Sequence, residues 1–322
     1  MFRFGRKLLA TAALSGLVGI ATASTYPANP ITVVTPFPAG GATDTLARLL
    51  TEHMSATLGQ SLIVENRAGA ATTIGASYTA RQKPDGYTIL LATNSTLVTN
   101  RFLFKELSYD PDAFAPIGMI GIGPMVLLAN KDLGFKNLQD VVKTAKSKPD
   151  TLTIASFGTG TSSHLAAEYL QSLAGIKLLH IPFKGTTQAM PQLIAGEVDI
   201  FFDMVSTGMP QVSANKVNAL AVTSKQRLSN LPELPTVSEG GYPAYEMTAW
   251  FTLVAPPGTP ENITGTLRTA LQKALQDPKI RQRMQDMGLE PADGSAQAII
   301  EQIRTESPVI GSLVKQANIP VQ

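Results

Sequence analysis

Two short segments rich in Gly, Ser and Thr contain the residues best suited to chemistry in this sequence. The first is Phe37-Pro-Ala-Gly-Gly-Ala-Thr43 and the second is Phe157-Gly-Thr-Gly-Thr-Ser-Ser163. Each lies between a β-branched apolar run and a helical pattern, so each is expected to lead from a strand into the start of a helix. Amide N–H groups at a helix start lack partners, and the helix dipole places about half a positive charge there. Such a loop holds a carboxylate without Arg or Lys, and neither segment contains one.

The glycines and hydroxyls of these segments fit the same chemistry. Glycines 40, 41, 158 and 160 allow the backbone to approach a ligand closely, and the Thr and Ser residues add hydroxyl donors. Two such helix ends facing each other at the C-terminal edges of parallel strands would clamp a carboxylate. The alternative is that each loop only caps its helix, as small polar turns often do. Asp44 fits that alternative, because an acidic residue in a first turn is favoured by the dipole. The matched pair of loops favours binding.

Motifs for an enzyme or a metal site are missing from the sequence. The histidines, at positions 53, 164 and 180, do not form an H-E-x-x-H pattern, and no G-x-S-x-G or nucleotide-binding glycine motif occurs. Without cysteine there is neither thiol catalysis nor a disulfide. Asp199 and Asp203 flank a strand and would lie about 13 Å apart, too far for one acid–base pair on one bond. We therefore predict no catalytic residue, cofactor or metal, and expect Asp203 to contact the distal end of a ligand.

The elements that position these loops follow an α/β pattern. Strands are predicted where β-branched apolar runs occur, and helices where apolar residues recur every three or four positions. The predicted strands are 31–35, 62–65, 87–91, 125–129, 152–155, 198–202 and 219–222, and the clearest helices are 44–58 and 164–174. Strands alternating with helices predict mainly parallel sheets, and the length predicts two domains. Gly- and Pro-marked stretches at 117–124 and 250–257 are predicted to be two short crossings between the domains, about which they could close.

The N-terminus has the pattern of a secretory signal. Arg3, Arg6 and Lys7 precede an uncharged run that ends at Ala21-Thr22-Ala23. This predicts a signal peptide over residues 1–23, since the apolar run is shorter than the roughly 20 residues of a membrane anchor. Of 26 basic and 24 acidic residues, 23 and 24 remain after its removal, a net charge of −1. No basic stripe is left to suggest nucleic acid as a partner.

The order of motifs along the mature sequence resembles one family, the Bug-type substrate-binding receptors of tripartite tricarboxylate transporters. The resemblance covers essentially the whole mature chain. It rests on the following segments: Pro36-Phe-Pro-Ala-Gly-Gly-Ala-Thr-Asp44, Val64-Glu-Asn-Arg-Ala-Gly69, Pro84-Asp-Gly-Tyr-Thr88, Gly158-Thr-Gly-Thr-Ser-Ser-His-Leu-Ala166, Ile181-Pro-Phe-Lys-Gly185, Gly196-Glu-Val-Asp199 and Ala255-Pro-Pro-Gly-Thr-Pro260. The sequence departs from the family at Phe183, where Tyr is common, and at Met190-Pro191 and Pro308. These departures leave the identity of the ligand open.

The resemblance implies a periplasmic two-lobe receptor that grips a small carboxylate with backbone amides and hydroxyls. Lobe one would comprise residues 24–123 and 248–322, and lobe two residues 124–247. With Asn94 and Asp203 added, the expected ligand contacts are Phe37, Gly40, Gly41, Ala42, Thr43, Asn94, Gly160, Thr161, Ser162, Ser163, His164 and Asp203. A monomer that delivers its ligand to membrane transporter subunits is expected. A periplasmic hydrolase or isomerase on the same scaffold, or a receptor that signals to a sensor protein, are the alternatives.

Overall fold

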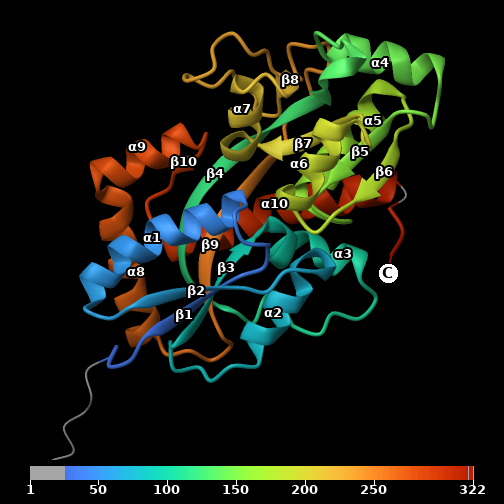
Figure 1. The fold of residues 1–322 in the computed structure, drawn as a ribbon. Coiled ribbons are helices and arrows are strands. Elements are labelled where there is room, and N and C mark those ends of the chain that lie inside the picture. Colours follow the sequence, from blue (N-terminus) through green and yellow to red (C-terminus); the bar gives the residue numbers. More distant parts are fainter. Residues whose placement is uncertain (1–25, 318, 322) are drawn as a thin grey trace, which may run out of the picture.

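The computed structural model describes residues 26–317 and 319–321, in which helices and strands alternate to form two lobes (Figure 1). The predicted α/β class and two-lobe architecture are confirmed. The predicted signal peptide, residues 1–23, lies outside the described residues. Within the described part of the chain, no helix is long and apolar enough to span a membrane.

The strands run in one curled order across both lobes, β2-β1-β3-β9-β4-β7-β5-β6, and β8 and β10 add to β4. The first lobe contains β1 (Ile31–Thr35), β2 (Leu62–Asn66), β3 (Thr88–Thr93), β9 (Thr248–Ala255) and β10 (Glu290–Pro291). The second contains β5 (Thr153–Ser156), β6 (Leu179–Pro182), β7 (Ile200–Met204) and β8 (Val217–Val222). β1 pairs in parallel with β2 and β3, and β5 with β6 and β7. The parallel pairs therefore support both predicted loops, while the pairs made by β4 and β9 are antiparallel.

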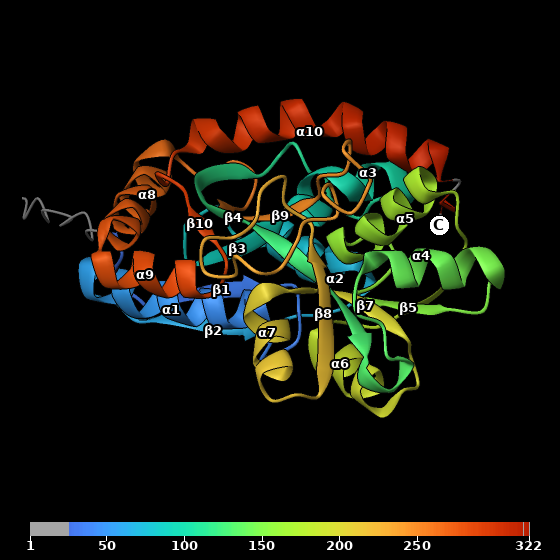
Figure 2. The same ribbon diagram turned by 90° about the horizontal axis from the view of Figure 1, so that it is seen from above.

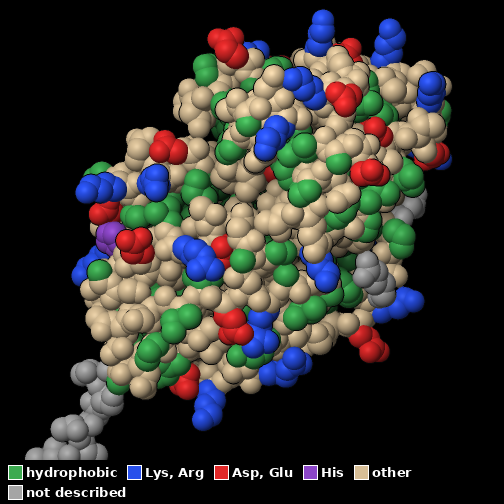
Figure 3. All heavy atoms as spheres, in the orientation of Figure 1, with side chains coloured by type: hydrophobic (Ala, Val, Ile, Leu, Met, Phe, Trp, Pro, Cys, Tyr) green, Lys and Arg blue, Asp and Glu red, His purple; other side chains and the backbone are tan. Residues whose placement is uncertain are grey.

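The helices cover both lobes. In the first lobe they are α1 (Ala42–Leu58), α2 (Thr73–Ala80), α3 (Asn100–Leu103), α8 (Glu261–Gln276), α9 (Pro278–Asp286) and α10 (Ala296–Gln316). In the second they are α4 (Leu138–Ser147), α5 (Ser162–Ala174), α6 (Thr186–Ala195) and α7 (Val205–Ser213). Helices α1, α8 and α9 pack together on one side of the first lobe. Over the face in view, Lys and Arg are interspersed with Asp and Glu (Figure 3).

The strand β4 (Ala115–Asn130) passes continuously from one lobe to the other. It pairs with β9 as far as Pro124 and with β7 from Met125 onward. The predicted crossing at 117–124 is thus part of a strand, and its glycines serve close packing. A β-carbon on Gly118 would lie 2.3 Å from the carbonyl oxygen of Gly294, and one on Gly121 would lie 2.6 Å from that of Glu290. Glycine in a strand permits this approach of another backbone.

The second predicted crossing, at residues 250–257, was wrong. Most of this stretch is the buried strand β9, which lies inside the first lobe between β3 and β4. The chain returns from the second lobe before Thr248. The physical reason is that the apolar run from Trp250 to Ala255 is buried on both faces of the sheet, which is a strand pattern and not a linker pattern.

Helix α10 bridges the two lobes at the back of the molecule. It packs on β4 and α3 of the first lobe and on α5 of the second (Figure 2). Its Glu306 is partly buried and accepts hydrogen bonds from the indole N–H of Trp250 and, at 3.2 Å, from Nδ2 of Asn94. Burial raises the pKa of Glu306, against the lowering effect of these bonds. Asn94 is therefore fixed from behind by the bridging helix.

Candidate ligand-binding cleft

The first predicted loop joins β1 to α1 and is held rigid by Asp44 and Asn66. The carboxylate of Asp44 accepts from the Gly40 N–H at 3.0 Å and pairs with Arg48. Nδ2 of Asn66 donates to the carbonyl of Phe37 at 3.1 Å and to Asp44 at 2.9 Å. Burial of Asp44 would raise its pKa, but the bonds from Arg48, Gly40 and Asn66 outweigh burial and lower it. Asp44 is thus a fixed anion of the scaffold, as its first-turn position predicted.

The second predicted loop joins β5 to α5 and is supported by its own side chains. The hydroxyl of Thr161 donates to the carbonyl of Gly158 at 2.7 Å, and the Gly160 N–H donates to Nδ1 of His164 at 3.1 Å. The hydroxyl of Ser163 donates to the carbonyl of Phe202 at 2.6 Å, which ties the loop to β7. The hydroxyl of Ser162 donates to Oδ1 of Asn94, 3.2 Å away in the first lobe. The two lobes therefore touch at this loop.

A histidine pair lies beneath the second loop. The rings of His164 and His180 stack with centroids 4.0 Å apart, and Nε2 of His180 lies 2.6 Å from the hydroxyl of Ser156. Burial, with a smaller effect of His164, lowers the pKa of His180 to about 3. A Ser–His contact of this length is what a hydrolase needs, but the Ser156 hydroxyl is fully buried and accepts from the Gly158 N–H. The pair therefore supports the loop.

The His180 pKa gives a prediction about acid stability. A folded pKa near 3 lies below the ordinary value of about 6.5, so the unfolded chain takes up a proton that the folded chain refuses. This contribution lowers the free energy of unfolding progressively as pH falls from about 6.5 toward 3. We expect His180→Gln to flatten the pH dependence of urea unfolding in that window. Equal slopes for the variant and the wild type would contradict this.

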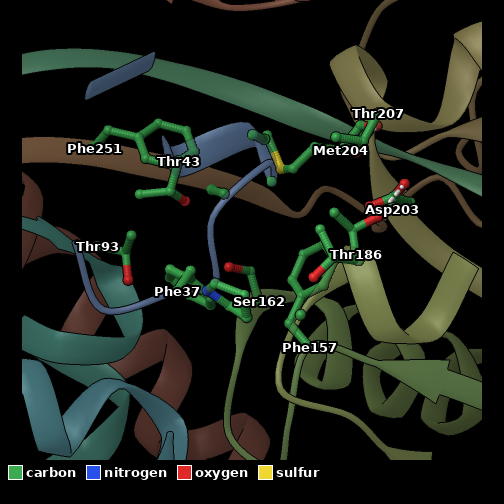
Figure 4. Close-up of a pocket in the computed structure, with 16 residues that line it drawn as sticks. Phe37, Thr43, Thr93, Phe157, Ser162, Thr186, Asp203, Met204, Thr207 and Phe251 are labelled. Carbon is green, nitrogen blue, oxygen red and sulfur yellow. Dashed lines mark hydrogen bonds between the residues drawn. The ribbon is translucent and has the colours of Figure 1, made fainter. Parts of the chain in front are cut away.

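A pocket, here named the inner pocket, lies between the two lobes (Figure 4). Loops, helix starts and strand residues from both lobes line it: Phe37, Pro38, Gly41, Ala42, Thr43, Thr93, Phe157, Ser162, Gly185, Thr186, Thr187, Asp203, Met204, Thr207, Ala249 and Phe251. The rings of Phe37 and Phe157 meet edge to face, with centroids 6.4 Å apart, from opposite lobes. Both rings also line an adjoining pocket that includes Lys184. The two rings therefore lie between the inner pocket and the adjoining one.

Four helices begin at the inner pocket. Their first turns are represented in its lining by Ala42 of α1, Ser162 of α5, Thr186 of α6 and Thr207 of α7. None of these four helices has a side chain that caps its first N–H groups among the described residues. The described lining residues of this pocket also include no Lys or Arg. The positive potential that they provide is therefore that of backbone dipoles.

Six of the twelve predicted contacts line the pocket, namely Phe37, Gly41, Ala42, Thr43, Ser162 and Asp203. The other six support these from behind: Gly40, Asn94, Gly160, Thr161, Ser163 and His164. The sequence interpretation missed the contribution of α6 and α7, which bring Thr186, Thr187, Met204 and Thr207 to the pocket. The signal for α6 was present, because Phe183-Lys-Gly185 repeats the order of an aromatic residue, a glycine and a helix start.

Asp203 and Thr93 each have a buried oxygen in this pocket that lacks a partner among the described residues. The Asp203 side chain is fully buried at the end of β7, and its Oδ2 accepts from the Thr186 hydroxyl at 2.9 Å. Its Oδ1 and the hydroxyl of Thr93 have no hydrogen-bond partner among the described residues. The nearby Thr207 hydroxyl donates instead to the carbonyl of Met204, at 3.2 Å. Burial raises the pKa of Asp203 to about 7, and the proximity of Thr207, Thr186 and the Met204 N–H offsets only part of this rise. Among the described residues, here or elsewhere, no group of three or more acidic or His side chains could hold a metal ion.

Over most of its length the chain is similar to one family of known proteins. Residues 46–319 match the family model described as the tripartite tricarboxylate transporter family receptor. The structure of the periplasmic binding protein BugD is 38% identical, with a TM-score of 0.88, over 92% of this chain and all of that one. A Rhodopseudomonas palustris protein solved with adipate is 33% identical, with a TM-score of 0.89, over 92% of this chain and 99% of that one. MatC of the same organism, with bound malate, is 33% identical, with a TM-score of 0.85, over 90% of this chain and all of that one. The chain therefore belongs to the family of tripartite tricarboxylate transporter receptors.

Proposed function

We propose that this protein is a periplasmic receptor that binds a small carboxylate between its lobes and delivers it to the subunits of a membrane transporter. Residues 1–23 would be removed on export. The lobes would comprise residues 24–123 with 248–322, and residues 124–247, and the receptor would act as a monomer. Lobe closure about β4 would bring the two loops together around the ligand.

The observation that carries this proposal is the convergence of four uncapped helix starts on one pocket between the lobes. Their N–H groups and dipoles favour an anion, and the Thr and Ser hydroxyls add donors. The family membership and the adipate- and malate-bound relatives support a carboxylate as that anion. A hydrolase has no comparable support, because the buried Ser156–His180 pair is absent from the lining of the pocket.

A thermal-shift screen tests the proposed function. The panel consists of mono- and dicarboxylates, with the corresponding amides as uncharged controls. A bound carboxylate at a hundred times its Kd should stabilise the protein by about 2.7 kcal/mol, because it binds only the folded state. The amides should give no shift. If no carboxylate raises the melting temperature or gives a calorimetric signal, the proposed function is overturned.

Thr43→Val tests the clamp with almost no change of shape. Thr43 lies in the first turn of α1 and lines the pocket, so the substitution removes one hydroxyl beside the ligand. We expect the affinity for a bound carboxylate to fall about tenfold, corresponding to about 1.4 kcal/mol for a lost hydrogen bond to an anion. Thr45→Val is the matched control, since Thr45 lies two residues further along α1 and is exposed. Equal affinities of the two variants would show that Thr43 serves only the helix.

A further inference from the structure

The buried carboxylate of Asp203 limits which carboxylates suit the pocket. Asp203 lines the pocket from the end of β7, and its side chain is entirely buried. One carboxylate oxygen is held by Thr186, and the other has no partner in the described structure. A buried acceptor without a partner costs free energy, so it marks a position where a ligand donor would be favourable.

Asp203 also lies away from the first loop within the pocket. Figure 4 shows Asp203 near Thr186 and Thr207, whereas Thr43 and Thr93 lie at the other side of the pocket. Between these two ends the lining contains apolar side chains, including Phe157 and Met204. A ligand whose carboxylate is held at the α1 side would therefore place an apolar middle part against these side chains and reach the Asp203 side with its far end.

Charge determines which functional groups of a ligand are favourable at the Asp203 end of the pocket. A second ligand carboxylate beside the ionised form of Asp203 would add a like charge in a buried pocket whose described lining residues contain no Lys or Arg. A hydroxyl or protonated amine would instead donate to the free oxygen of Asp203. We propose that the ligand is a monocarboxylate with an apolar middle and a hydrogen-bond donor at its far end, and that Asp203 selects it against dicarboxylates. This inference rests on the proposed function and narrows it.

Two matched ligand series test this selectivity by calorimetry. One is butyrate, 4-hydroxybutyrate, 4-aminobutyrate and succinate, and the other is benzoate, 4-hydroxybenzoate, 4-aminobenzoate and terephthalate. Within each series that binds, we expect a donor-bearing member to bind at least tenfold more tightly than both the dicarboxylate and the unsubstituted acid. Because the amine and the hydroxyl are separate members, the series also distinguishes a charged from a neutral donor.

Asp203→Asn is the decisive variant, because it keeps the shape of the side chain and adds an amide donor. We expect it to reverse the ranking, so that donor-bearing ligands lose at least tenfold and the dicarboxylate gains. Asp199→Asn is the matched control: Asp199 precedes the same strand, bonds Thr153 and is absent from the pocket lining. It should leave the ranking unchanged.

A proton measurement adds a second readout for the amine. Because burial raises the pKa of Asp203 to about 7, part of the unliganded protein carries a protonated Asp203 at pH 7. An ammonium group beside it would favour the ionised form, so 4-aminobutyrate binding should release protons, and Asp203→Asn should abolish this release. Calorimetry in two buffers of different ionisation enthalpy measures it.

The outcomes separate this inference from the proposed function. If the wider panel contains binders but dicarboxylates bind as tightly as donor-bearing acids, or Asp203→Asn leaves the ranking unchanged, the inference is wrong and the receptor function stands. If no carboxylate of any kind binds, the receptor function fails and the inference fails with it.

Discussion

Gly41→Asp is expected to abolish carboxylate binding, with more than a hundredfold loss of affinity, while leaving the fold as stable as before. Gly41 is the N-cap of α1, with φ of −84°, a conformation open to any residue. A β-carbon there would lie 3.6 Å from its nearest neighbours, Thr186 and the carbonyl of Pro38, which is an ordinary contact. Aspartate is among the preferred N-cap residues, so the substitution suits the helix. It also places a fixed negative charge where the ligand anion would bind.

The prediction is checked by calorimetry together with a melting curve of each variant. Gly41→Ala is the control, because it adds the β-carbon without the charge and should bind within a few-fold of wild type. Loss of affinity with unchanged stability in Gly41→Asp would indicate an anion site at this helix start, whereas a residue that only caps the helix would affect stability and not affinity. If Gly41→Asp binds carboxylate like Gly41→Ala, the α1 start is no part of the site.

The second large effect is expected just outside the pocket lining, at Gly288→Ala. Gly288 lies between α9 and β10 in the first lobe, and a β-carbon there would lie 2.7 Å from Cβ of Val205, the first residue of α7 in the second lobe. Val205 is buried and β-branched, so it has little freedom to move aside. If ligand is held only when the lobes meet, the added methyl group at this contact should weaken binding between ten- and a hundredfold. This range corresponds to the usual free-energy cost of overpacking.

The control for Gly288→Ala must carry the same backbone strain. Gly134 has φ of +66° against +74° for Gly288, and a β-carbon there would meet nothing within 4 Å. Both alanine variants should lose about 1 kcal/mol of stability from the left-handed conformation. Only Gly288→Ala should lose affinity, and small-angle scattering with saturating ligand should show a larger radius of gyration for it. Equal affinities of the two variants would exclude the lobe contact from the binding mechanism.

Much of the site could be predicted from sequence because its chemistry is local. A strand followed by small residues and a helix fixes where free N–H groups lie, so Gly41, Thr43 and Ser162 can be placed at helix starts from their neighbours alone, whereas Ala42 is implied by the family resemblance. The roles of Gly40 and His164 could not be predicted from sequence. Whether such a residue faces the pocket or supports its loop depends on backbone and side-chain torsion angles, which the sequence pattern does not give. Those two positions bond other parts of their own loops, at Asp44 and Gly160.

The parts that the sequence did not reveal depend on distant contacts. The glycines of β4 look like a linker in sequence, and only the backbone of residues 290–294 packed against them explains why they are compatible with a strand. Helix α6 contains Pro191 and helix α7 contains Pro210. Proline in a sequence argues against a helix, although both of these helices contain their proline within the helical segment. Their contribution to the pocket therefore became visible only when the strands were placed side by side.

The connectivity of the first lobe has a consequence for the order in which the protein folds. Leu90 on β3 pairs with Val254 on β9, and α10, the last helix, packs on β4. Pairing β3 with β9 closes a long loop of chain, which is slow because of its entropy cost. The strands β5, β6, β7 and β8 of the second lobe lie closer together in the sequence, so their pairing closes shorter loops. A chain that emerges from its N-terminus onward would therefore assemble its second lobe while β1, β2 and β3 still await their partner. The lobe that is synthesised first is thus expected to be finished last, and until then its unpaired β3 edge is the part most exposed to aggregation.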